Sequence, residues 1–149
     1  KYSVEYLIVG GTAVAFHGYY RMSIQPNNLP ADKHDLDFWF NPTYKNYFNL
    51  LNSMETLGII VTEFKEELAP NPKKSYFRHD FEDFKIDFLP QIIGLKSFRE
   101  AFSNRIVSNI DGIEICTISL EDLIKSKEAS LRNKDMDDIN NLKFINRKE

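Results

Sequence analysis

The distribution of apolar residues predicts a chain that begins with a strand, a glycine turn and a helix. Residues 6–9 form a short apolar run that ends at Gly10 and Gly11, which is typical of a buried strand followed by a tight turn. Thr12 is then expected to cap a helix over residues 13–19, because its side-chain oxygen can accept a hydrogen bond from the first helical N–H groups.

The later apolar patterns predict further strands and helices. Apolar residues that alternate with polar ones, or run on without interruption, predict these strands: residues 35–40, 59–64, 76–79, 84–89, 106–110 and 113–118. The last two flank Asp111 and Gly112, a pair that favours a hairpin turn. Apolar residues at every third or fourth position predict these helices: residues 44–57, 97–104, 120–131 and 139–145. This order predicts one α+β or α/β domain over residues 1–149, with helices on one side of a sheet.

Residues 22–34 interrupt the pattern and are predicted to form a loop. The segment contains several loop-forming residues: Pro26, Asn27, Asn28 and Pro30. A loop of this length in a small domain is usually functional or disordered.

Composition narrows the classes of function. The 149 residues carry a formal net charge of -3 and a pI of about 5.7. Proteins that grip a nucleic acid backbone are usually basic, so general DNA binding is not expected. No apolar stretch approaches the roughly 20 residues of a membrane span. The one cysteine, Cys116, lies in an apolar run, which suits a small buried hydrophobe. A single thiol is also consistent with a reducing compartment, so we expect a cytoplasmic protein without membrane association.

Three aspartates in apolar strands are the first candidates for chemistry. Alternation places Asp35 and Asp37 on one face of a strand, with Cα atoms roughly 7 Å apart, so their side chains can converge on a hard cation. Asp87 lies in a second apolar strand. If the two strands are neighbours, Asp87 completes a three-carboxylate site able to hold two divalent ions for phosphoryl or nucleotidyl transfer. The alternative is that these residues are charges on a solvent-exposed face.

The glycine turn is the second candidate. Glycines at residues 10 and 11 let the backbone approach a phosphate closely, and the N–H groups at the start of the next helix favour an anion. An ordinary turn is the alternative.

Lys127 is the third candidate, because it occupies the apolar stripe of the predicted helix 120–131. Its ammonium group either points towards the glycine turn or the aspartates, where it would serve a ligand, or extends into water along an apolar stem. The charged residues that follow are compatible with a solvated run: Arg132, Lys134 and Asp135.

Taken together, these residues resemble the nucleotidyltransferase superfamily with the DNA polymerase β-like fold. The superfamily motif is an apolar strand, Gly-Gly or Gly-Ser, a helix, Asp-x-Asp and a later lone Asp on a strand. In this chain the parts are residues 7–12, residues 35–37 (Asp-Leu-Asp) and residues 86–88 (Ile-Asp-Phe). The resemblance implies a mixed sheet with helices packed on it.

A closer resemblance is to small bacterial nucleotidyltransferases of abortive-infection and toxin–antitoxin systems. Residues 9–21, which end in His-Gly-Tyr-Tyr-Arg, are similar to the Gly-Gly segment of those proteins, in which an arginine precedes Asp-x-Asp. Residues 120–127 and 132–139 are similar to their C-terminal Leu-Glu-Asp-Leu-Ile-x-x-Lys and Arg-x-Lys-Asp-x-x-Asp-Ile segments. One departure is that residues 22–34 separate the arginine from the Asp pair.

The resemblance implies transfer of a nucleoside monophosphate from a nucleoside triphosphate to an acceptor, with release of pyrophosphate. Asp35 and Asp37 would bind two Mg²⁺ or Mn²⁺ ions, and Asp87 would bind the catalytic ion and help to activate the acceptor hydroxyl. The implied nucleotide-binding residues are Gly10, Gly11, Thr12, Arg21 and Lys127. The acceptor would be a protein, an RNA or a small molecule, and a toxin–antitoxin partner protein is a further expectation.

Two other classes of function compete with this hypothesis. A catalytically inactive nucleotide-binding or protein-interaction module of the same fold is the first, because many members of the family act in two-component systems and residues 22–34 set this chain apart. A hydrolytic metalloenzyme is the second. It is disfavoured because the histidines show no metal-ligand spacing in the sequence.

Overall fold

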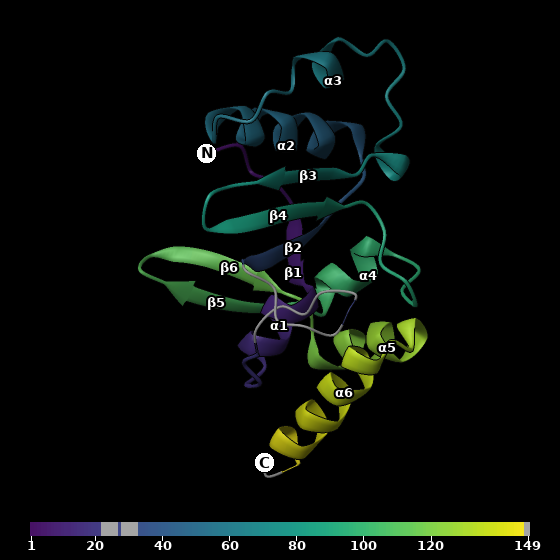
Figure 1. The fold of residues 1–149 in the computed structure, drawn as a ribbon. Helices are drawn as coiled ribbons and strands as arrows, with labels where there is room; N and C mark the ends of the chain where they lie inside the picture. Colours follow the sequence, from purple (N-terminus) through teal and green to yellow (C-terminus); the bar gives the residue numbers. More distant parts are fainter. Residues whose placement is uncertain (22–26, 28–32, 148–149) are drawn as a thin grey trace.

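The computed structural model describes residues 1–21, 27 and 33–147, and this part of the chain is built around a six-stranded mixed sheet (Figure 1). The strand order is β3-β4-β2-β1-β6-β5. The strands are Tyr6–Val9 (β1), His34–Phe40 (β2), Phe77–Asp80 (β3), Phe84–Leu89 (β4), Ile106–Ile110 (β5) and Ile113–Thr117 (β6). Most of the predicted loop 22–34 lies outside the described residues.

Helices cover both faces of the sheet, so the expectation of helices on one side was wrong. The helices are Gly10–Phe16 (α1), Tyr44–Thr56 (α2), Thr62–Glu66 (α3), Phe98–Ser103 (α4), Leu120–Ser130 (α5) and Asn133–Asn146 (α6). Trp39 and Phe40 are neighbours in β2 and therefore point to opposite faces. Trp39 belongs to the core cluster that includes residues of α1, α4, α5 and α6, whereas Phe40 belongs to the cluster that includes α2. Figure 1 shows α2 and α3 at one end of the molecule and α5 and α6 at the other.

Capping and turn residues within the elements themselves determine where α2 begins and ends and where the β5–β6 hairpin turns. The Thr43 hydroxyl accepts a hydrogen bond from the N–H of Asn46 and caps α2, and Gly58 follows the helix with a φ of 84°. In the hairpin, Asp111 and Gly112 have φ values of 52° and 80°, as a two-residue turn of the favoured twist requires. Both predictions are confirmed.

The strand predicted at residues 59–64 is wrong. Thr62 begins the short helix α3 instead. Ile59 and Val61 are buried in the cluster around α2, while the intervening Ile60 is 85% exposed. Burial does alternate along this segment, but the segment is a connection that packs against α2 and not a strand of the sheet.

The predicted capping role of Thr12 is also wrong. Helix α1 begins two residues earlier, at Gly10, and Val9 occupies the cap position without a side-chain hydrogen bond. The Thr12 hydroxyl donates to the Asp35 carbonyl oxygen at 3.2 Å instead. Thr12 therefore ties α1 to the start of β2.

Register between neighbouring strands positions the candidate site. β2 and β4 are parallel, and Asp37 pairs with Asp87 across them. β1 is antiparallel to β2, with Val9 opposite Asp37, so the glycine turn begins at the level of these aspartates. None of the helices in the described residues is both long enough and apolar enough to cross a membrane.

Candidate active site

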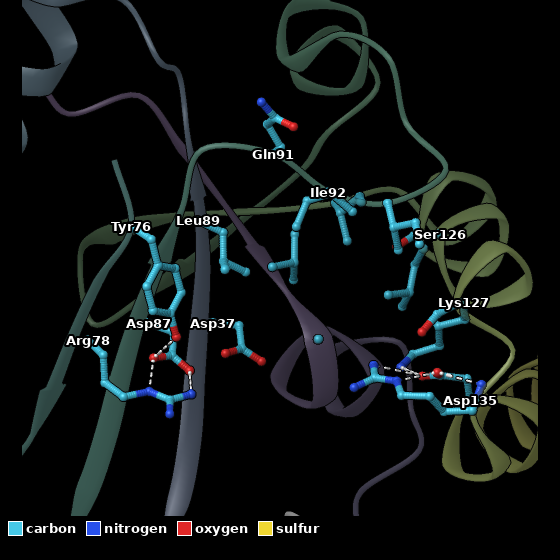
Figure 2. Close-up of a pocket in the computed structure, with 17 residues that line it drawn as sticks. Asp37, Tyr76, Arg78, Asp87, Leu89, Gln91, Ile92, Ser126, Lys127 and Asp135 are labelled. Atoms are coloured by element: carbon cyan, nitrogen blue, oxygen red, sulfur yellow. Dashed lines mark hydrogen bonds and ion pairs between the residues drawn. The ribbon is translucent and has the colours of Figure 1, made fainter. Parts of the chain in front are cut away.

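Asp37 and Asp87 lie side by side on adjacent strands, as the sequence predicted. They are register partners in β2 and β4, and such neighbours are about 4.8 Å apart across a sheet. Both line a cavity of about 350 Å³. Figure 2 shows their carboxylates on the same side of the two strands. The predicted adjacency of the two aspartate strands is confirmed.

The charge of Asp37 is poorly compensated. Burial, followed by the charges of Asp87 and Asp35, raises the pKa of Asp37 to about 6. Among the described residues, no cationic side chain forms an ion pair with Asp37. This carboxylate is therefore held in a place that favours an external positive charge.

Asp87 has the opposite environment. Arg78 donates from Nε and Nη2 to its two oxygens at 2.7 and 3.0 Å, and the Tyr76 hydroxyl donates to Oδ1 at 2.8 Å (Figure 2). Burial by itself would raise the pKa of Asp87, but the bonds from Arg78 and Tyr76 outweigh burial and lower it. Burial and the neighbouring Asp87 raise the pKa of Tyr76 to about 12, so this phenol remains a donor.

Gly10 brings the turn into contact with this pair. Its φ is 64°, and a Cβ at this position would overlap the Asp37 carboxylate. Glycine is therefore required here both by the left-handed backbone and by the close approach. At Gly11 a Cβ would meet the Arg21 guanidinium at 3.6 Å, so this arginine lies beside the second glycine.

A network of charged side chains adjoins another wall of the cavity, which Lys127, Arg132 and Asp135 line. Arg21 donates from Nε and Nη2 to Asp138 at 2.6 and 2.7 Å. Lys127 Nζ lies 2.8 Å from Asp138 and 3.2 Å from Asp135. Arg132 Nε lies 2.7 Å from Asp135. Three cations thus share two carboxylates, and Figure 2 shows Lys127 and Asp135 across the cavity from the Asp37 pair.

These contacts settle two expectations about the C-terminal charges. The snorkelling alternative for Lys127 is wrong, because the residue is only 5% exposed. Lys127 lines the same cavity as Gly10 and Asp37, but its ammonium binds the carboxylates of α6 rather than the aspartate pair. The solvated run is wrong for Asp135, which is fully buried and accepts from the N–H and side chain of Arg132.

The electrostatic field of this wall is positive. Burial, followed by the charges of Arg132 and Arg21, lowers the pKa of Lys134. Burial would raise the pKa of Asp135, yet bonds from Arg132 and the charge of Lys127 lower it to about 2. An anionic ligand facing this wall would find a net positive charge.

Asp35 lies next to the pair but in a different hollow. It lines a cavity of about 230 Å³ together with Gly11, Thr12 and Arg21. In the part of the chain that the structure describes, no group of three His, Cys, Asp or Glu side chains is arranged to hold a metal ion. Asp37 and Asp87 therefore line one cavity, and Asp35 lines a separate one.

The sequence patterns did not predict a role at the site for Tyr76, Arg78, Asp135 and Asp138. Tyr76 and Arg78 alternate with apolar neighbours and face Asp87, and this alternation was visible in the sequence. Asp135 and Asp138 share the buried stripe of α6 with Ile139, a spacing of three and four residues that signals a carboxylate on an apolar face.

Comparison with known proteins agrees with this fold. The family model described as "Nucleotidyltransferase of unknown function (DUF6036)" matches residues 1–149. The crystal structure of the lincosamide antibiotic adenylyltransferase LnuA with lincomycin bound is similar, with a TM-score of 0.51 and 16% sequence identity. The similarity covers 94% of this chain and 86% of that chain. No curated protein matches the chain.

Proposed function

The chain belongs to the nucleotidyltransferase family DUF6036, and we propose that it transfers a nucleoside monophosphate from a nucleoside triphosphate to an acceptor hydroxyl, with a divalent metal ion at Asp37 and Asp87. In this reaction the acceptor oxygen forms a bond to the α-phosphorus and the bond to pyrophosphate breaks. The hydroxyl proton passes to the Asp87 carboxylate.

The proposal rests on one cavity in which a wall with two carboxylates faces a wall with positive charge. Asp37 and Asp87 provide a pair of oxygen ligands on one side. Lys127 and Arg132 provide positive charge on the other. A metal-bound triphosphate needs both, because the ion requires carboxylates while the phosphates require cations.

The aspartate pair fits a divalent ion in donor chemistry. Mg²⁺ typically binds through one or two carboxylates together with substrate phosphates, so a third protein ligand is not required. The uncompensated charge of Asp37 favours such an ion. We assign Asp37 and Asp87 as Mg²⁺ or Mn²⁺ ligands and Asp35 as a supporting ligand for a second ion. The bound ion would neutralise charge on the transferred phosphoryl group.

The chain's own residues orient the nucleotide. Gly10 and Gly11 permit close approach of a phosphate to the backbone, and Thr12 holds the turn to β2. Arg21 and Lys127 supply positive potential through the network with α6. These roles extend the family assignment to particular side chains.

The acceptor and the biological setting belong to the same proposal. The sequence resemblance to abortive-infection and toxin–antitoxin nucleotidyltransferases suggests a cytoplasmic enzyme with a partner protein and a protein or RNA acceptor. The similarity to LnuA, a lincosamide antibiotic adenylyltransferase, favours the third expected acceptor class, a small molecule.

Metal and nucleotide binding test the proposal directly. We would measure the melting temperature with Mg²⁺ or Mn²⁺, with and without a non-hydrolysable nucleoside triphosphate. A ligand at about 100 times its Kd stabilises the native state by about 2.7 kcal/mol, which raises the melting temperature by about 5–10 °C. Asp37→Asn should abolish this shift and also abolish pyrophosphate release in a screen of triphosphates.

Asp111→Asn is the matched control. It makes the same chemical change at an exposed turn whose positive φ suits asparagine. If the wild type shows no metal-dependent shift, or Asp37→Asn retains it, the catalytic proposal fails. Metal-nucleotide binding without turnover of any acceptor would favour the inactive binding module of the same fold.

A further inference from the structure

A second cavity adjoins the one that holds the aspartate pair. Its volume is about 450 Å³, and it shares Gln91 and Ile92 with the first cavity. Trp39 of β2 lines it and follows Asp37 by two positions on the same face, a separation of roughly 7 Å along the strand. Figure 2 shows Gln91 on the side of the site away from Asp135.

The charges around this cavity are all positive. Lys73, Lys96 and Arg99 line it, and no aspartate or glutamate among the described residues does. None of these three side chains forms an ion pair with another described residue. The whole chain carries a net charge of -3, so such a local excess of unpaired cations is not a consequence of composition. Unpaired cations around a concave surface attract anions.

The walls of the cavity are anchored. The Trp39 indole N–H donates to the Pro90 carbonyl oxygen at 3.2 Å, and the ring packs edge-on against Phe98 at 5.3 Å between centroids. The Gln91 amide donates to the Lys73 carbonyl oxygen at 3.0 Å. Arg99 follows Phe98 in α4. Lys73 and Arg99 are therefore carried by segments that are held against the strands of the aspartate site.

We propose that this second cavity binds a phosphate group of the acceptor, which is a small phosphorylated molecule. The volume lies within the range of about 300–1,000 Å³ typical of small-molecule sites. An acidic protein is poorly suited to a long nucleic acid backbone. The acceptor assignment rests on the proposed function, whereas phosphate binding by Lys73, Lys96 and Arg99 does not.

In the bound complex the phosphate would hold the acceptor beside Asp37 and Asp87. A hydroxyl of the acceptor then forms a bond to the α-phosphorus of the triphosphate as the bond to pyrophosphate breaks. The hydroxyl proton passes to Asp87, as in the proposed reaction.

The test uses ribose 5-phosphate as the probe and ribose as its uncharged control. Amide chemical shifts of the isotope-labelled 17.4 kDa chain report where the probe binds. We expect ribose 5-phosphate, but not ribose, to shift the signals of residues 73 and 95–99. Lys96→Gln/Arg99→Gln should weaken binding about tenfold for each lost charge-assisted contact.

Lys45→Gln/Arg147→Gln is the matched control, because it removes the same charge from exposed positions on α2 and after α6. Equal affinity of wild type and Lys96→Gln/Arg99→Gln for ribose 5-phosphate would overturn the site. A 5′-phosphorylated RNA oligonucleotide that binds far more tightly than ribose 5-phosphate, with the same loss in the variant, would overturn the small-molecule assignment.

Nucleotide binding is measured separately, so the two proposals fail independently. A wild-type protein that binds ribose 5-phosphate but no metal-nucleotide would leave the phosphate site in place and refute the transferase mechanism. A protein that binds metal-nucleotide but never ribose 5-phosphate would refute the phosphate site alone.

Discussion

Lys127→Met should destabilise the protein through the buried network, and its effect can be estimated from the contacts. Lys127 is 5% exposed, and its ammonium lies 2.8 and 3.2 Å from two fully buried carboxylates, Asp138 and Asp135. Removing one partner of a buried pair costs about 3–5 kcal/mol when a charge is left alone. Here Arg21 and Arg132 still bind these carboxylates, so we expect a smaller loss of about 2–3 kcal/mol, reasoning from the same principle.

The loss should lower the melting temperature by about 5–10 °C in a chain of this size. Urea unfolding followed by circular dichroism gives the free energy directly. Lys125→Met is the matched control, since Lys125 is exposed on the same helix and should change stability by less than about 0.5 kcal/mol.

A double-mutant cycle isolates the ion pair from other effects of the methionine. Adding Asp138→Asn to Lys127→Met removes a carboxylate that has lost one cation, so the two substitutions together should cost less than the sum of their separate effects. Equal stability of Lys127→Met and Lys125→Met, or strict additivity in the cycle, would refute the network. The result also bears on function, because a large loss of stability would mean that lost nucleotide binding in Lys127 variants cannot be attributed to a direct phosphate contact.

Two further predictions concern acid stability and the glycine turn. The pKa of Asp135 is depressed to about 2, so its contribution is complete above the unfolded value near 4 and is lost as the pH falls towards 2. The free energy of unfolding of the wild type, measured with urea, should therefore fall by about 2 kcal/mol between these pH values, and Asp135→Asn should lack this fall. Gly10→Ala should destabilise the protein more than Gly112→Ala. Each substitution costs about 1–2 kcal/mol for the left-handed backbone, but only a side chain at position 10 meets the Asp37 carboxylate. Equal losses of stability in thermal unfolding would contradict this close approach of the turn to Asp37.

The sequence predicted the fold where local signals agreed with burial. The Gly10 turn, the α2 helix with its cap and glycine stop, and the Asp111-Gly112 hairpin all depend on short-range chemistry. The strand prediction for residues 59–64 failed because burial at every second residue does not distinguish a strand from a connecting segment that packs on the core. The helices on the second face were missed because β2 ends in apolar side chains on both faces, Trp39 and Phe40, and the sequence does not state which helix covers which face.

The candidate site was predictable only in part. Asp37 and Asp87 were paired correctly because both interrupt apolar strands, and parallel pairing of β2 with β4 then brought them together. The alternation of Tyr76 and Arg78 predicts that they share a face, but the pairing of Arg78 with Asp87 depends on the register between β3 and β4. Asp138 is 117 residues from Arg21, and this pairing depends on the packing of α6 against the start of the chain.

The aspartates of the candidate site and of the adjoining charge network differ in how their charge is compensated by cations. Arg78 compensates Asp87, and Arg21 and Lys127 compensate Asp138, so bonds from cations lower both pKa values despite burial. Asp37 is half-buried beside another carboxylate, has no ion-pair partner among the described residues, and its pKa is raised instead. Because Asp37 also lies against the glycine turn, a metal-bound triphosphate that bridges the two would compensate its charge, as the proposed function requires.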